Sequence, residues 1–164
     1  MHKRVVIADS SPVFRFGLSQ ILAKHEGYEI ASEFESGQEL ELWLGLNDVD
    51  LIIIDCLAPH FSVDTVLACQ RLKPGTKMLA ITSSHSGQSI VHALRAGITS
   101  YVKKDCSMEE VIEAIEETSN GGTFFCGQIL AAIKADSIEV NDLELANASC
   151  DPILLTDREI EVLT

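Results

Sequence analysis

The sequence predicts an α/β fold built on a doubly wound, five-stranded parallel sheet. Strand-like and helix-like patterns alternate five times within roughly the first 120 residues of the 164-residue chain. The segment Leu51–Asp55 also places four apolar residues in succession before an acid, which suits a parallel strand buried on both faces. Right-handed βαβ connections would then place helices on both faces of the sheet.

The strand patterns are short apolar runs, and a helical pattern follows each of them. The five predicted strands occupy residues 4–9, 28–34, 51–55, 78–82 and 99–103. The five predicted helices occupy residues 12–22, 37–44, 63–72, 88–96 and 108–118.

Local signals mark the ends of the predicted helices. Pro12 stands in the first turn of the first helix, where a proline is tolerated because its missing N–H would have no partner there. Ser36 with Glu39, and Ser107 with Glu110, form capping-box patterns that open the second and fifth helices. Gly97 follows the fourth helix and is a typical stop signal.

The pattern changes after Gly122. Residues 128–135 favour one short helix, and the acidic, polar stretch up to Asp151 is typical of a linker. Thr156 and Glu159 then open a further helix that the sequence leaves incomplete. We therefore expect three parts: a domain at 1–122, a linker with a short helix at 123–152, and the start of a second domain at 153–164.

Charge and composition limit the classes of function. The net charge is −13, and residues 1–122 and 123–164 both carry more acidic than basic side chains, so neither part has the basic surface that nucleic-acid binding needs. No apolar run approaches the length of a membrane span, and we expect a cytoplasmic protein without a membrane partner. The five cysteines include no C-x-x-C pair, which favours buried free thiols over a zinc site.

Chemically useful side chains stand at the ends of four predicted strands: Asp9 with Ser10, Asp55, Thr82 with Ser83, and Lys103 with Lys104. In an open α/β sheet, functional groups gather at the carboxyl ends of the strands. If the strand order is 2-1-3-4-5, these strands are neighbours, and two carboxylates, a hydroxyl and an ammonium meet at one edge. Carboxylates suit Mg²⁺, and a hydroxyl with a lysine suits a phosphoryl group. The set therefore predicts an aspartate that receives phosphate.

These motifs resemble, in order and spacing, those of a response regulator receiver domain. The resemblance rests on five segments, of which the last resembles the opening of a NarL/FixJ (LuxR-type) helix-turn-helix domain: Val6–Pro12, Leu51–Pro59, Ala80–Ser83, Ala96–Asp105 and Leu154–Leu163. It implies a flavodoxin-like, CheY-like fold, and a two-component protein that controls transcription as a homodimer through its DNA-binding domain. It implies no enzyme activity beyond accepting a phosphoryl group and releasing it by autodephosphorylation.

The resemblance also assigns roles to single residues. Asp55 would accept phosphate from a sensor histidine kinase, and Thr82 and Lys104 would contact the phosphoryl group. Tyr101 would report the change by rotating inward. Mg²⁺ would be held by Asp9, Asp55 and the backbone carbonyl of Leu57, with a weak contribution from Ser10, which replaces the usual second acid.

Three positions depart from the family pattern and keep an alternative open. Ser10 lacks the charge of the usual acid, so weakened Mg²⁺ binding is expected. His60 and Val63 stand where glycines are common, which predicts a differently shaped loop. The alternative is a pseudo-receiver that dimerises a transcription factor without phosphorylation. A flavodoxin-like redox domain is disfavoured, because the loop at 10–12 is too short to cradle a cofactor phosphate.

Overall fold

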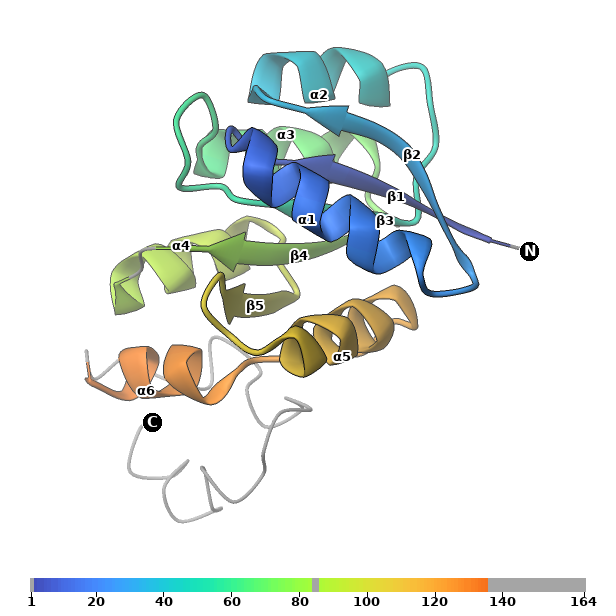
Figure 1. Ribbon diagram of the computed structural model, residues 1–164. Coiled ribbons are helices and arrows are strands. Elements are labelled where there is room, and N and C mark those ends of the chain that lie inside the picture. Colours follow the sequence, from blue (N-terminus) through green and yellow to red (C-terminus); the bar gives the residue numbers. More distant parts are fainter. Residues whose placement is uncertain (1, 84–85, 136–164) are drawn as a thin grey trace.

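The computed structural model describes residues 2–83 and 86–135, in which strands and helices alternate (Figure 1). The strands are β1 (Lys3–Ala8), β2 (Tyr28–Phe34), β3 (Leu51–Ile54), β4 (Lys77–Thr82) and β5 (Ser100–Lys103). The helices are α1 (Pro12–Ala23), α2 (Gly37–Leu44), α3 (Val63–Leu72), α4 (Gly87–Ala96), α5 (Met108–Ser119) and α6 (Gly127–Ala135). All five predicted strand–helix units are present.

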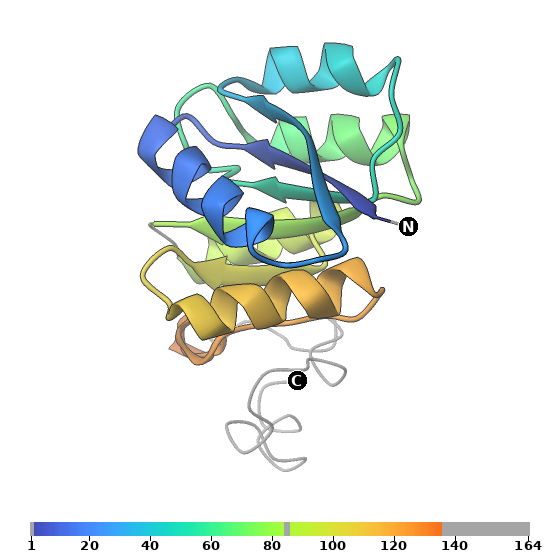
Figure 2. The same ribbon diagram turned by 45° about the vertical axis from the view of Figure 1, so that its right-hand side comes forward.

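The five strands form one parallel sheet in the order β2-β1-β3-β4-β5, which confirms the predicted fold class and topology. Figures 1 and 2 show α1 and α5 on one face of the sheet and α2, α3 and α4 on the other. The order reverses between β1 and β3, so a crevice is expected outside the carboxyl ends of these two strands.

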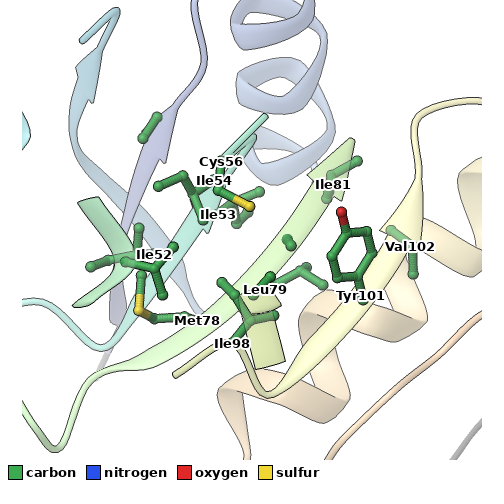
Figure 3. Close-up of a cluster of buried hydrophobic side chains, with 14 of the residues drawn as sticks. Ile52, Ile53, Ile54, Cys56, Met78, Leu79, Ile81, Ile98, Tyr101 and Val102 are labelled. Atoms are coloured by element: carbon green, nitrogen blue, oxygen red, sulfur yellow. The ribbon is translucent and has the colours of Figure 1, made fainter. Parts of the chain in front are cut away.

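The core lies on both faces of the central strands. The side chains of Leu51–Ile54 are at most 1% exposed, as the uninterrupted apolar run predicted. Figure 3 shows part of this cluster, in which the ring of Tyr101 on β5 lies beside Leu79 and Ile81 of β4. The central strands are therefore held by packing on both faces, and their carboxyl ends form a rigid base for polar side chains.

The predicted helix caps are in place. The hydroxyl groups of Ser36 and Ser107 accept hydrogen bonds from the backbone N–H groups of Glu39 and Glu110, at 3.3 and 3.2 Å. Gly97 follows α4 with a φ of +137°, a conformation that residues with a side chain rarely adopt. These helix ends follow from local sequence alone.

The segment after α5 packs onto the sheet. The backbone carbonyl of Phe124 accepts a 2.9 Å hydrogen bond from the backbone N–H of Tyr101, and Phe125 forms a parallel bridge with Tyr101. The predicted helix at 128–135 is present as α6, which contacts α4 and β5 and buries Ile129, Leu130 and Ile133. The rest of the expected linker, from residue 136 on, and the expected second domain at 153–164 lie outside the described residues.

Within residues 2–83 and 86–135, no helix has both the length and the apolar composition to cross a bilayer.

Candidate functional site

Backbone hydrogen bonds carry the sheet one residue beyond the strands and so position the acids and the lysine. The N–H of Asp9 donates to Phe34, that of Asp55 to Ala8, and that of Lys104 to Thr82, at 3.0, 3.0 and 2.9 Å. Each side chain therefore starts from a fixed point at the carboxyl edge of the sheet.

The structure brings both acids onto one lysine. The Nζ atom of Lys104 lies 2.8 Å from Oδ2 of Asp9 and 2.9 Å from Oδ2 of Asp55. Asp9 and Asp55 are only 3% and 4% exposed. Lys103 instead contacts the exposed side chain of Asp105 at 3.5 Å. Of the two adjacent lysines, Lys104 is therefore the one that pairs with both buried acids.

The second oxygen of each carboxylate is bound by the backbone that follows it. Oδ1 of Asp9 accepts from the N–H of Ser11 at 2.8 Å, and Oδ1 of Asp55 accepts from the N–H of Leu57 at 3.0 Å. These bonds fix the rotation of both carboxylates and turn their remaining oxygens toward Lys104. The side chains are thus held ready for a cation or a reacting group.

Two neighbours of this site were missed by the sequence reasoning. Lys104 Nζ lies 4.6 Å from the ring centroid of Phe14, a cation–π distance. The guanidinium of Arg15 donates to the backbone carbonyl of Asp9 at 2.5 Å and lies 3.6 Å from the carboxylate of Glu33. In the sequence, Phe14 falls on the apolar face of its predicted helix, which indicates only packing. Arg15 belongs to none of the motifs that the sequence shows.

The ion pairs control the charge of Lys104. Burial by itself lowers the pKa of this lysine, but the hydrogen bonds to Asp9 and Asp55 outweigh burial and raise the pKa above its ordinary value. Lys104 therefore stays protonated at neutral pH, and its positive charge can offset the charge of an anion at this edge of the sheet.

Thr82 and Tyr101 form a second, fully buried part of the site. Both residues are 0% exposed, and their hydroxyl oxygens lie 3.1 Å apart. Burial also raises the pKa of the Tyr101 phenol, so the phenol stays protonated. Figure 3 shows this hydroxyl pointing toward the end of β4 that carries Ile81. The ring thus already occupies the inward position that the resemblance associates with the switched state.

Ser10 and His60 line a separate open pocket of about 550 Å³ beside the acids. Glu35 and Glu39 also line this pocket and give it acidic character. His60 adopts a φ of +70°, the left-handed region that glycine favours, and its carbonyl accepts a 2.8 Å hydrogen bond from the N–H of Gly37. The backbone of the loop at His60 therefore has the conformation that glycine favours, although the residue carries a side chain. Val63 is the first residue of α3.

The donor set fits a hard divalent cation. Two buried carboxylates converge on the position of one nitrogen atom, and carboxylate oxygens are the ligands that Mg²⁺ prefers. Asp9 and Asp55 would hold the ion, with the carbonyl of Leu57 and the hydroxyl of Ser10 as the further candidates. A bound ion would share both carboxylates with Lys104.

Comparison with known proteins gives a family match over more than half of the chain. Residues 5–116 match the family described as the response regulator receiver domain. The response regulator protein VraR of Staphylococcus aureus, found in strains Mu3 and NCTC 8325, is 29% identical over 163 residues. This match covers 98% of the chain and 73% of VraR.

Two solved structures share the fold. A two-component response regulator of the LuxR family from Aurantimonas sp. SI85-9A1 superposes with a TM-score of 0.75 at 20% identity, over 83% of this chain and 98% of that one. RcsB from Salmonella enterica serovar Typhimurium, bound to promoter P1flhDC in the presence of phosphomimetic BeF3−, also gives 0.75 at 20% identity, over 82% of this chain and 67% of RcsB.

Proposed function

This chain belongs to the response regulator receiver domain family, and on that premise we propose that Asp55 is its phosphoacceptor. One observation supports the proposal above all. The carboxylate of Asp55 is buried at the end of β3, and Lys104 Nζ lies 2.9 Å from it, with Asp9 on the same lysine. A buried carboxylate that shares a lysine cation with a second acid is equipped to receive a phosphoryl group with a divalent ion.

The phosphoryl donor is a phosphohistidine of a sensor histidine kinase. An oxygen of Asp55 attacks phosphorus, an acyl phosphate bond forms, and the bond from phosphorus to the histidine nitrogen breaks. Lys104 offsets the charge that the phosphoryl oxygens bring, and the hydroxyl of Thr82 donates a hydrogen bond to one of them. When bound, Mg²⁺ supplies further positive charge at the same oxygens.

The output is control of transcription. RcsB, whose structure is described as bound to a promoter, shares the fold over 82% of this chain. With a net charge of −13, the present residues are themselves poor DNA ligands. DNA binding is therefore assigned to a LuxR-type domain that begins at residues 153–164. The receiver occupies 1–122, a linker occupies 123–152, and paired DNA half-sites favour a homodimer.

Intact mass spectrometry tests the phosphoacceptor directly. After incubation with acetyl phosphate and Mg²⁺, the protein is expected to gain one phosphoryl group that hydroxylamine removes, as it does from acyl phosphates. Asp55→Asn keeps the shape and removes the nucleophile, so this variant is expected to gain none. Equal gain by Asp55→Asn would show that the phosphoacceptor is another residue.

A pseudo-receiver is the second candidate function, and one observation favours it. Tyr101 is already buried against Thr82, in the inward position that the resemblance associates with the switched state. Such a domain would dimerise the transcription factor without phosphorylation. The same mass measurement separates the two functions when light scattering accompanies it. The pseudo-receiver would be favoured if the parent gains no mass and the Asp55→Asn protein forms the same fraction of dimer as the parent.

A further inference from the structure

Two cysteines and one glutamate meet just after the loop residue Lys104. Cys106 lies between β5 and α5, Glu110 lies in the first turn of α5, and Cys126 directly precedes α6. One ligand atom from each of the three lies within 4.8 Å of the others. The two cysteines are twenty residues apart in the sequence, and only the fold brings them together.

The backbone around these side chains is well fixed. The N–H of Cys106 donates to Lys103 at 3.1 Å, and the N–H of Cys126 donates to Tyr101 at 3.4 Å. The hydroxyl of Ser107 contacts the carboxylate of Glu110 at 3.3 Å and caps its backbone N–H at 3.2 Å. A ligand set held in this way by a strand and two helix starts needs little rearrangement to bind an ion.

The chemistry of the set favours a borderline metal ion over the hard ion of the acidic site. Two thiols and a carboxylate match Zn²⁺, whereas Mg²⁺ prefers oxygen ligands alone. A Zn–S bond of about 2.3 Å places two sulfur atoms of a tetrahedral site roughly 3.8 Å apart. This separation is compatible with the spacing of the cluster, and the sequence pattern alone had pointed away from zinc.

We propose that Cys106, Glu110 and Cys126 form a binding site for a divalent cation of the Zn²⁺ class. Cys106 also lines, together with Phe14 and Lys104, an open groove of about 330 Å³, so this ligand is reached from the surface. Occupancy would tie the loop next to Lys104 to the start of α6 and, through the backbone of Cys126, to the strand that carries Tyr101. The site does not depend on whether Asp55 accepts phosphate.

Titration of the reduced protein with Co²⁺, a spectroscopic substitute for Zn²⁺, tests the site. The experiment uses the full chain with the substitution Cys150→Ser, which removes the one cysteine outside the described residues. We expect one equivalent of Co²⁺ to give thiolate-to-cobalt charge-transfer absorption, which added Zn²⁺ abolishes and excess Mg²⁺ does not. No such absorption, or equal displacement by Mg²⁺, would overturn the proposal.

The decisive variants are Cys106→Ser and Glu110→Gln, because both positions are only partly buried. Losing a direct ligand is expected to weaken Co²⁺ binding by at least about tenfold, since even residues that only support a ligand are worth that much. Cys69→Ala, which removes a buried thiol of α3, should bind Co²⁺ like the parent. Circular dichroism of each variant checks that it is folded. Unchanged Co²⁺ binding by a folded Cys106→Ser variant would refute the site. A protein that forms a Cys106–Cys126 disulfide, and whose reduced form binds no Co²⁺, would refute it as well.

Discussion

The ammonium nitrogen of Lys104 lies 2.9 Å from Oδ2 of Asp55, although β4 lies between their two strands in the sheet. The lysine side chain therefore crosses the end of β4, and its aliphatic part runs over the sheet before its charge reaches the acids. In doing so it joins the carboxyl ends of β1, β3 and β5 through two ion pairs. The stability of this edge should depend on that single cation.

Lys104→Met is expected to lower the free energy of unfolding by about 2–3 kcal/mol. Removing one partner of a buried ion pair costs roughly 3–5 kcal/mol, and the partial exposure of Lys104 reduces that figure. Chemical denaturation at neutral pH measures the change. Lys103→Met is the matched control, because its ion pair with Asp105 is exposed and is worth at most about 1 kcal/mol. Equal losses in the two variants would contradict the assignment.

The ion pairs of Lys104 also predict a pH dependence of stability. The pKa of Lys104 is raised in the folded protein, so this lysine binds its proton more tightly when folded than when unfolded. Its stabilising contribution should be complete below the ordinary lysine pKa of 10.5 and should disappear as the pH rises through the higher pKa of the folded state. The stability difference between the parent and Lys104→Met, followed by denaturation across alkaline pH, should therefore shrink. A constant difference would show that Lys104 does not titrate as proposed.

Ser10→Asp is expected to tighten Mg²⁺ binding by about one to three decades. A full charge about 4 Å from the ion contributes on the order of 1–4 kcal/mol, depending on the effective dielectric, and each ~1.4 kcal/mol is tenfold in affinity. Calorimetric titration of both proteins gives the comparison. Ser62→Asp adds the same charge at the start of α3 and should leave the affinity close to that of the parent. If Ser10→Asp binds no better than Ser62→Asp, residue 10 is not a metal ligand.

Tyr101→Phe is expected to lower the free energy of unfolding by about 1 kcal/mol. The change removes a hydroxyl that is fully buried and hydrogen-bonded to Thr82, while the ring keeps its packing. Tyr28→Phe is the control, because its hydroxyl contacts Ser119 at a partly exposed position and should cost only about 0.5 kcal/mol. Thermal unfolding of the two variants and the parent shows which variant loses more stability. A larger loss for Tyr28→Phe would indicate that the buried hydrogen bond contributes little.

Gly37→Ala and Gly17→Ala are expected to change stability in opposite directions. A methyl group on Gly37 would collide with the side chain of Thr65, whose hydroxyl also holds the N–H of Ser62. Such overpacking costs about 1–3 kcal/mol. A methyl group on Gly17 meets no atom within 4 Å, and alanine favours the middle of α1 by about 0.5–1 kcal/mol. Denaturation midpoints that move in the same direction would contradict this prediction.

The sequence predicted the sheet, its strand order and the residues at its carboxyl edge. These features follow from local signals, because an apolar run such as Leu51–Ile54 fixes a central strand and the next residue must then lie at its end. The receiver-domain resemblance implied Lys104, and this lysine is the one that forms ion pairs with both acids. The roles of these residues in phosphoryl transfer stay predictions.

What the sequence did not predict depends on segments that meet only after folding. The ring of Phe14 under Lys104 joins α1 to the end of β5, and Cys106 meets Cys126 across the start of α6. Nothing in the local pattern of either segment signals the other. The left-handed backbone of His60 was also missed, because the sequence shows a side chain where the turn needs the freedom of glycine.

The pairing of residues 124–126 with β5 has a consequence for how much of the chain is needed in solution. β5 is an outer strand of the sheet, and Phe124, Phe125 and Cys126 bond to Tyr101 along its outer side. A recombinant fragment ending at Gly122, the boundary that the sequence suggests, would leave the N–H and the carbonyl of Tyr101 unpaired at this edge. Unprotected strand edges template pairing with other chains, so the shorter fragment should aggregate more readily than one that keeps residues 123–135.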